Sequence, residues 1–152
     1  MIERTRSVAK GEFSREKWPF YWLTRVTGRY LELLEPRLKK IGLDVSRWRV
    51  LSCLAEDEQI SISEIAEQAI VKMPTMMKIV QRMEADGLVS MATRASDGRV
   101  TEVSLTEMGL RARDEALAIA HAIHDRCFDD VPEDQREALN IQLRSIFVAL
   151  GR

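Results

Sequence analysis

The sequence predicts a mainly α-helical protein with one small β-hairpin. Apolar residues recur every three or four positions in six separate stretches, which is the spacing of a buried helix face. Between the fourth and fifth stretches the pattern changes to the alternation that is typical of strands. The chain has 152 residues, of which 45% are hydrophobic, so it can form one domain with helical extensions.

Composition and charge exclude several protein classes. No apolar run reaches the roughly 18 residues of a membrane span. Residues 1–17 are mixed in charge and lack the apolar core of a signal peptide, so we expect a cytoplasmic protein. The net charge is −1, yet residues 18–49 and 72–99 each carry more basic than acidic side chains, which allows a local basic surface. Cys53 and Cys127 lie in apolar helical patterns and are expected to be buried free thiols.

The first helix is expected over residues 15–40, after a polar arm. Pro19 fits only the first turn of this helix, since a proline farther inside would break its hydrogen bonds. Pro36 is expected to kink the last turns. Gly42 follows the helix at the position where a positive φ is required.

Five further helices and one hairpin follow. The helices are expected at about 45–56, 61–69, 74–86, 107–128 and 132–150. Asp44 or Ser46 can cap the first of these, Ser61 and Glu64 form a capping box, and Thr106 can cap the helix after the hairpin. The strands are expected over 88–93 and 100–105, with a turn over 94–99 centred on Asp97-Gly98.

The segment 61–109 joins two short helices to this hairpin, which is the order of a winged helix-turn-helix. Pro74 fits the start of its second helix, although Met73 before it is a poor cap. One face of that helix carries Met76, Ile79, Val80 and Met83, and is expected to be buried. The opposite face can reach bases or phosphates, unless the helix only packs in a core. Its candidate DNA-binding residues are Pro74, Thr75, Met77, Lys78, Gln81 and Arg82.

The predicted hairpin turn is the second candidate for contact with DNA. Arg94 and Arg99 bracket it, and an arginine on such a projection can enter a narrow minor groove. Asp97 would repel phosphate, so we expect it to hold an arginine side chain by an ion pair. The alternative is an exposed charged turn that only aids solubility. The candidate wing residues are therefore Arg94, Asp97 and Arg99.

Several short motifs resemble those of the MarR family of winged-helix regulators, over about Leu43 to Gly109. The wing pattern D-x-R-x5-L-T-x2-G is matched by Asp97, Arg99, Leu105, Thr106 and Gly109. The end of the family's recognition helix is similar to Arg82, Met83 and Glu84 followed by Gly87, Leu88 and Val89. The start of its second helix is similar to Gly42 and Leu43 with Trp48, Val50 and Leu51. One departure is Met91, which stands where the family usually has an arginine, and Arg94 could supply part of that charge.

The resemblance implies a transcriptional regulator, most commonly a repressor, that binds double-stranded DNA at a pseudo-palindromic operator. It implies a homodimer, with Arg99 in the minor groove and Asp97 as its support. It divides the chain into an N-terminal arm and dimerisation helix (1–42), a winged helix-turn-helix DNA-binding domain (43–106) and C-terminal dimerisation helices (107–152). Family members are typically released from DNA by small aromatic or phenolic acids.

Aromatic side chains at the start of the first helix suggest where such an acid could bind. Aromatic rings can stack on a planar ligand while an arginine pairs with its carboxylate. The alternative is that these residues pack in the dimer core. The candidate effector-binding residues are Trp18, Tyr21, Trp22, Arg25, Arg47 and Trp48.

Other functions have weaker signals. The sequence has no glycine-rich phosphate loop, nucleophile elbow or cysteine cluster, so we expect no enzyme, no cofactor and no metal. His121 and His124 share a helix face near Asp125 but lack a third ligand in a nearby motif. The alternatives that stay open are a winged-helix protein-interaction module without an effector, and a redox- or metal-responsive regulator.

Overall fold

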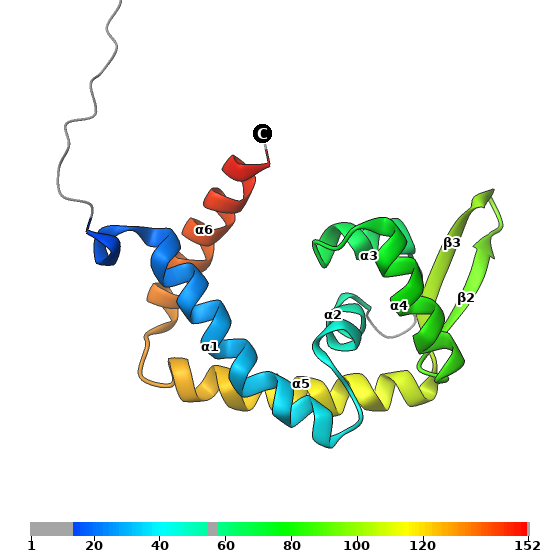
Figure 1. Cartoon of the computed structure of the whole chain (residues 1–152), viewed down its shortest axis with the longest axis horizontal. Helices are drawn as coiled ribbons and strands as arrows, with labels where there is room; N and C mark the ends of the chain where they lie inside the picture. The colour runs from blue at the N-terminus through cyan, green and yellow to red at the C-terminus, as the bar shows by residue number, and fades with distance from the viewer. Residues whose placement is uncertain (1–13, 55–57, 152) are drawn as a thin grey trace, which may run out of the picture.

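The computed structural model describes residues 14–54 and 58–151, and it confirms a mainly helical fold with one small sheet (Figure 1). Two long helices, α1 (Pro19–Lys40) and α5 (Glu107–Phe128), pack against each other along one side of the molecule. A head stands on them, made of α2 (Val45–Cys53), α3 (Ile62–Gln68), α4 (Met73–Ala85) and the sheet. The last helix, α6 (Glu133–Leu150), rises on the side away from the strands (Figure 1).

The start of α1 differs from the prediction. Residues Arg15–Lys17 form a separate 3-10 turn, η1, and α1 begins at Pro19, so the expected start at residue 15 is wrong. The reason is local: proline disfavours helical backbone in the residue before it, and Trp18 is extended, with φ −98° and ψ 115°. At the other end α1 continues past Pro36 to Lys40, and Gly42 has the predicted positive φ, at 75°.

Side-chain caps set the starts of three helices as the sequence predicts. The carboxylate of Asp44, and not the hydroxyl of Ser46, accepts the Arg47 N–H at the start of α2. Both bonds of the capping box between Ser61 and Glu64 are present, and Thr106 caps α5. The expected end of α2 at residue 56 is wrong, because the helix ends at Cys53 and Leu54 is already extended; residues 55–57 lie outside the described ones.

Helix α4 starts one residue earlier than predicted. Met73 is its first residue and Lys72 its N-cap, so the expectation of Met73 as the cap is wrong. Pro74 therefore lies within the first turn, where its missing N–H leaves no helix hydrogen bond unmade. The far end is close to the prediction, with Asp86 as C-cap and Gly87 at φ 77°.

The hairpin belongs to a three-stranded antiparallel sheet in the order β1-β3-β2. Its strands are β1 (Ile60–Ser61), β2 (Val89–Arg94) and β3 (Asp97–Leu105). Arg94 pairs with Asp97 after a register shift, so the connecting turn consists of residues 95 and 96 alone. A turn centred on Asp97-Gly98 was expected and is wrong, because both residues begin β3. The two-residue β1 was not predicted, since it is too short to show alternation.

One hydrophobic core joins the long helices to the head. It contains Leu34 and Leu38 of α1, Val80 of α4, Val103 of β3 and Ala116 of α5, all without solvent exposure. Each large apolar side chain buried in this way stabilises the fold by about 1.5–3 kcal/mol. In the described part of the chain, no buried side-chain nitrogen or oxygen lacks a hydrogen-bond partner. The head is therefore held against α1 and α5 by shared packing and does not hang from a linker.

Helix α6 contrasts with this core because none of its residues is buried. Its exposed apolar side chains are Leu139, Ile141, Phe147, Val148 and Leu150. Trp22 and Val26 on the first half of α1 are likewise exposed, as is Trp18 just before it. Apolar surface on this scale is typical of a protein interface. Among the described residues, no helix is both long and apolar enough to cross a membrane.

We predict that Gly109→Ala destabilises the fold by about 3 kcal/mol or more. A Cβ at this position would lie 1.8 Å from the backbone oxygen of Leu88, where α5 crosses the start of the wing. Backbone cannot move away as a flexible side chain would. Urea unfolding measures the change, with Gly98→Ala as the control because a Cβ there meets no atom within 4 Å. Equal stability of the two variants would show that α5 and the wing are not packed this closely.

Candidate nucleic-acid interface

Helix α4 has one face in the core and one in solvent. Met76, Val80 and Met83 are fully buried against the rest of the head. Thr75, Lys78, Gln81 and Arg82 are exposed, as is Pro74 at the start of the helix. Met77 differs from the other candidates, since it is partly buried and packs on the core. Five of the six predicted residues are therefore exposed to solvent.

The N-terminus of α4 has no side-chain cap and no acidic residue beside it. Its N-cap residue is Lys72. The neighbouring α3 is the opposite case, because Ser61 and Glu64 occupy its first N–H groups. A phosphate can accept hydrogen bonds from free N–H groups at such a helix end. In α4, however, Pro74 has no N–H and the Thr75 N–H bonds to the Lys72 carbonyl at 3.0 Å, so this helix end attracts an anion through its dipole and Lys72 and not through a set of free N–H groups.

The wing carries Arg99 close to the tip of the hairpin, as the third residue of β3 after the turn at residues 95 and 96. The Arg99 side chain is 94% exposed. The Asp97 carboxylate accepts a hydrogen bond from the Arg99 backbone N–H at 3.1 Å and lies 3.4 Å from its Nε. These contacts restrain the base of the arginine while the guanidinium stays in solvent, as expected of a supporting carboxylate.

Arg94 is directed differently from Arg99. Its Nε lies 2.6 Å from Glu102 on the neighbouring strand, and this carboxylate raises the pKa of the Arg94 guanidinium. In the free protein, Arg94 is therefore an ion-pair partner within the wing. The expectation that Arg94 replaces a missing positive charge beside Met91 is weakened, because Glu102 already compensates that charge.

Met91 shows how the wing is attached to α4. The Glu84 carboxylate on α4 accepts a hydrogen bond from the Met91 backbone N–H at 3.0 Å. β2 is an edge strand, so this N–H points away from β3 and needs another partner. The Met91 side chain packs on the core, where an arginine would be costly to bury. Sequence reasoning missed this role of Glu84, because nothing in its spacing indicates a backbone partner.

Two arginines that the sequence did not assign to the interface fasten elements together, one joining the head to α5 and the other joining α2 to α4 within the head. Arg113 of α5 donates a hydrogen bond to the carbonyl of Leu54, the C-cap of α2, at 3.1 Å. Arg47 of α2 pairs with Asp44 at 2.8 Å and with Asp86 at the end of α4. Arg113 and Leu54 are 59 positions apart in the sequence, and Arg47 and Asp86 are 39 apart, so neither contact could be predicted from local sequence patterns.

Comparison with known proteins identifies this architecture. The model of the MarR family matches residues 43–101. The chain is 48% identical over 139 residues to the HTH-type transcriptional repressor IacR of Pseudomonas putida. The aligned region covers 91% of this chain and 83% of that protein. The chain belongs to the MarR family of transcriptional regulators.

Two further proteins are similar to this MarR chain. It is 32% identical over 121 residues to the homoprotocatechuate degradative operon repressor of Escherichia coli, covering 80% of this chain and 81% of that one. The crystal structure of CouR from Rhodococcus jostii RHA1 bound to p-coumaroyl-CoA has a TM-score of 0.77 and 28% identity, covering 88% and 94% of the two chains. The family binds operator DNA as dimers, so the chain is a DNA-binding regulator and not an enzyme.

The predicted effector residues fall into two groups in this MarR chain. Tyr21, Trp22 and Arg25 cluster at the start of α1, with ring centroids of Tyr21 and Trp22 5.1 Å apart and the Arg25 guanidinium 5.3 Å from the Tyr21 ring. Trp18 lies just before them, 5.9 Å from the ring of Phe20. Arg47 and Trp48 are on α2, beyond the other end of α1, a helix of 22 residues and about 33 Å. One chain therefore does not bring the six residues together.

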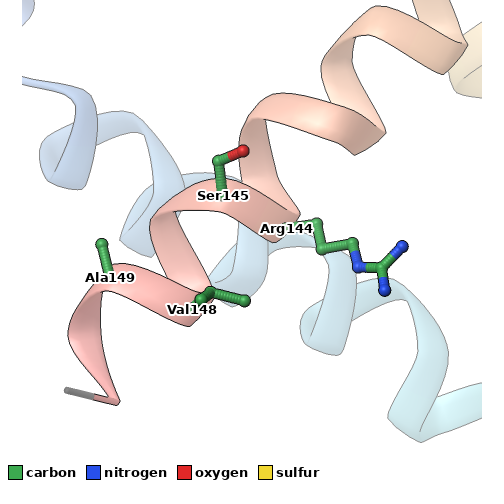
Figure 2. Close-up of a pocket in the computed structure, with 4 residues that line it drawn as sticks. All are labelled: Arg144, Ser145, Val148 and Ala149. Carbon is green, nitrogen blue, oxygen red and sulfur yellow. The ribbon is translucent and has the colours of Figure 1, made fainter.

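Two hollows on the surface differ in volume and in the elements that line them. A groove of about 530 Å³ between α1 and α5 is lined mainly by apolar side chains, among them Tyr30, Leu33 and Phe128. A smaller hollow of about 350 Å³ lies on the last turns of α6, and Figure 2 shows its lining residues Arg144 and Val148. Each hollow includes an exposed apolar side chain, Val26 in the groove and Val148 on α6, which is typical of surfaces that pack against another protein.

The cysteines and histidines contribute little to a sensor. Burial raises the pKa of the Cys53 thiol, which disfavours the reactive thiolate. Cys127 was expected to be buried, but it is exposed on the α1–α5 groove. His124 contacts Asp125 at 3.1 Å. Within residues 14–54 and 58–151, no group of three potential ligands could hold a metal ion.

We predict that Arg99→Ala weakens operator binding by roughly 5- to 100-fold, which corresponds to the loss of one DNA contact of about 1–3 kcal/mol. Its melting temperature should stay almost unchanged, because the side chain is 94% exposed. Fluorescence anisotropy on an operator fragment, together with thermal unfolding, measures both quantities.

Two matched variants control this prediction. Arg37→Ala removes an exposed arginine of α1 that bonds to the Leu33 carbonyl of its own helix, and should leave the affinity unchanged. Arg94→Ala should lower the affinity less than Arg99→Ala, because Glu102 already pairs with Arg94. A large drop in the melting temperature of Arg99→Ala would instead show that this residue has a structural role.

Proposed function

We propose that this protein is a repressor that binds a pseudo-palindromic operator as a homodimer and leaves it when a small aromatic carboxylic acid binds. The observation that carries the DNA-binding part is the joint exposure of the outer face of α4 and of Arg99 on the same head. The chromosome is its target, which places its action in the cytoplasm.

In this proposal α4 lies in the major groove and the wing follows the adjacent minor groove. Lys78, Gln81 and Arg82 face the bases or phosphates, and Thr75 with Pro74 enters first. Met77 contributes an apolar contact from the edge of this face. Arg99 reaches into the minor groove with Asp97 as its support, while Arg94 stays on its Glu102 partner until a phosphate competes for it.

The dimer is proposed to form from the two ends of the chain. Residues 1–42 and 107–152 supply the interface, and residues 43–106 form the reading head. The exposed apolar side chains of α6 and the apolar groove between α1 and α5 support this division, since a second copy would cover both. Two heads related by a twofold axis then read two half-sites about one helical turn apart.

An aromatic acid is the effector class that the relatives favour. One relative is named for the degradation of homoprotocatechuate, which is itself an aryl acetic acid, and CouR is bound to a coumaroyl thioester in its crystal structure. A regulator of aromatic-acid breakdown needs to sense the compound that is broken down. The alternative is redox control through Cys127, which is exposed in the single chain but lines the groove that the proposed dimer covers.

Footprinting on the DNA upstream of the protein's own gene tests the proposal. We expect a protected palindrome that is lost when homoprotocatechuate, phenylacetate or 4-hydroxyphenylacetate is added. Hydrogen peroxide on wild-type protein and on Cys127→Ser serves as the redox control. Protection that no acid reverses, but that peroxide abolishes in the wild type alone, would contradict the effector and favour the redox reading.

A further inference from the structure

A cleft of about 500 Å³ lies where the end of α1, the start of α2, the end of α4 and the start of α5 meet. Its apolar walls include Leu43, Leu88 and Met108. Its charged side chains include Arg47 from α2 and Arg111 from α5. Apolar walls with a few converging polar groups are typical of small-molecule sites. The volume suits a ligand with one aromatic ring and a short acidic side chain.

Arg47 in this cleft is joined to the recognition helix α4. Its Nη2 binds Asp86, the C-cap residue of α4, and its Nη1 binds Asp44 at 2.8 Å. A negative charge at the C-terminus of a helix is unfavourable, because the carbonyl ends of the peptide dipoles point there. Arg47 compensates that charge, so the ion pair holds the end of α4 against α2.

The Arg47 guanidinium has capacity for a further acceptor. Arginine carries five N–H donors, and in the described residues two of its terminal nitrogens each have one carboxylate partner. The Arg47 side chain is 28% exposed, so solvent reaches it from the cleft. A ligand carboxylate can therefore bind this guanidinium, and a carboxylate on arginine forms one of the stronger hydrogen-bonded pairs in proteins.

We propose that the cleft binds the carboxylate of a small aromatic acid on Arg47, in competition with Asp86, and thereby loosens the end of α4. This inference rests on the proposed function, since it names the site at which the effector acts. The ligand carboxylate and the Asp86 carboxylate repel each other when both lie against one guanidinium, so the ligand binds more tightly to the state in which Asp86 has moved away. An effector shifts an equilibrium only through such a difference in affinity.

The location of the cleft favours it over the aromatic cluster on α1. The hollow beside Trp22 and Arg25 is lined by residues of α1 alone, so a ligand there touches no element of the head. The cleft at Arg47 touches the residue that ends the recognition helix. Binding in this cleft can therefore change the placement of α4 directly.

Two carboxylates also line the cleft, Asp86 and Glu115, and both repel an acidic ligand. This gives two separable variants. Asp86→Asn removes the competitor for Arg47, so we expect about tenfold tighter binding of the acid and weaker binding of the operator. Glu115→Gln removes only the repulsion, so it should tighten acid binding while operator affinity stays at the wild-type value.

The experiment uses the full-length dimer with whichever of homoprotocatechuate, phenylacetate and 4-hydroxyphenylacetate releases the wild-type protein at the lowest concentration. Calorimetry measures acid binding, and anisotropy measures operator release. Arg47→Met should lose the response by tenfold or more, whereas Arg25→Met, in the aromatic cluster, should respond as the wild type does. The uncharged amide of the same acid should fail to release the wild type.

The outcomes distinguish a failure of the Arg47 site from a failure of the proposed function. Release of Arg47→Met at wild-type acid concentrations, or unchanged acid binding by Asp86→Asn, would overturn the site while the proposed function stands. The second result is decisive even if Arg47→Met folds poorly. A wild-type protein that binds its operator and is released by none of the three acids would overturn the proposed effector class, and this inference with it.

Discussion

The burial of one side of α4 is the constraint on which the rest of the structure depends. Met76, Val80 and Met83 have no solvent exposure, so the helix cannot rotate about its axis without exposing them. Each such side chain contributes roughly 1.5–3 kcal/mol of burial, which is large against the net stability of a small domain. Lys78 and Arg82 face outward because the opposite side of the helix is packed in the core. No contact made by these two side chains is required to hold them there.

The position of the wing is fixed by close contacts between the base of the hairpin and the start of α5. Gly109 lets α5 approach the backbone of Leu88 at a distance that no side chain allows. Thr106 caps α5 and also donates a hydrogen bond to the carbonyl of Gly87 at 2.6 Å. The threonine and glycine of the family's wing motif therefore fasten the base of the hairpin to the first turn of α5. Arg99, at the other end of the motif, is carried by this support.

Polar contacts at the ends of helices hold the elements of the head together and fasten the head to α5. Arg113 reaches the end of α2, Arg47 reaches the end of α4, and Glu84 reaches the first part of the wing. A helix end is where unpaired backbone groups and dipole charge concentrate, so a charged partner there has the greatest effect on placement. A change in one of these contacts moves a whole element, which is how a small ligand can alter DNA binding.

Local chemistry made much of the fold predictable from the sequence. The capping box at Ser61 and the caps at Asp44 and Thr106 depend on neighbours three residues away, and all are present. The errors arise where distant parts of the chain decide. The register of β2 against β3 placed the turn two residues before Asp97-Gly98, and tertiary packing drew Met77 partly inward. The predicted effector site combined residues from the start of α1 with residues of α2. Neighbouring positions of two helices in the sequence do not indicate which ends of the helices lie together in space.

Photo-crosslinking from the outer face of the head tests the central claim most directly. A photoreactive side chain at position 78, at position 99 or at the buried position 80 is placed in the dimer on a labelled operator. The account predicts crosslinks from 78 to major-groove bases and from 99 to the adjacent minor groove, with none from 80. Crosslinks from neither 78 nor 99, on an operator that the protein still protects, would contradict it.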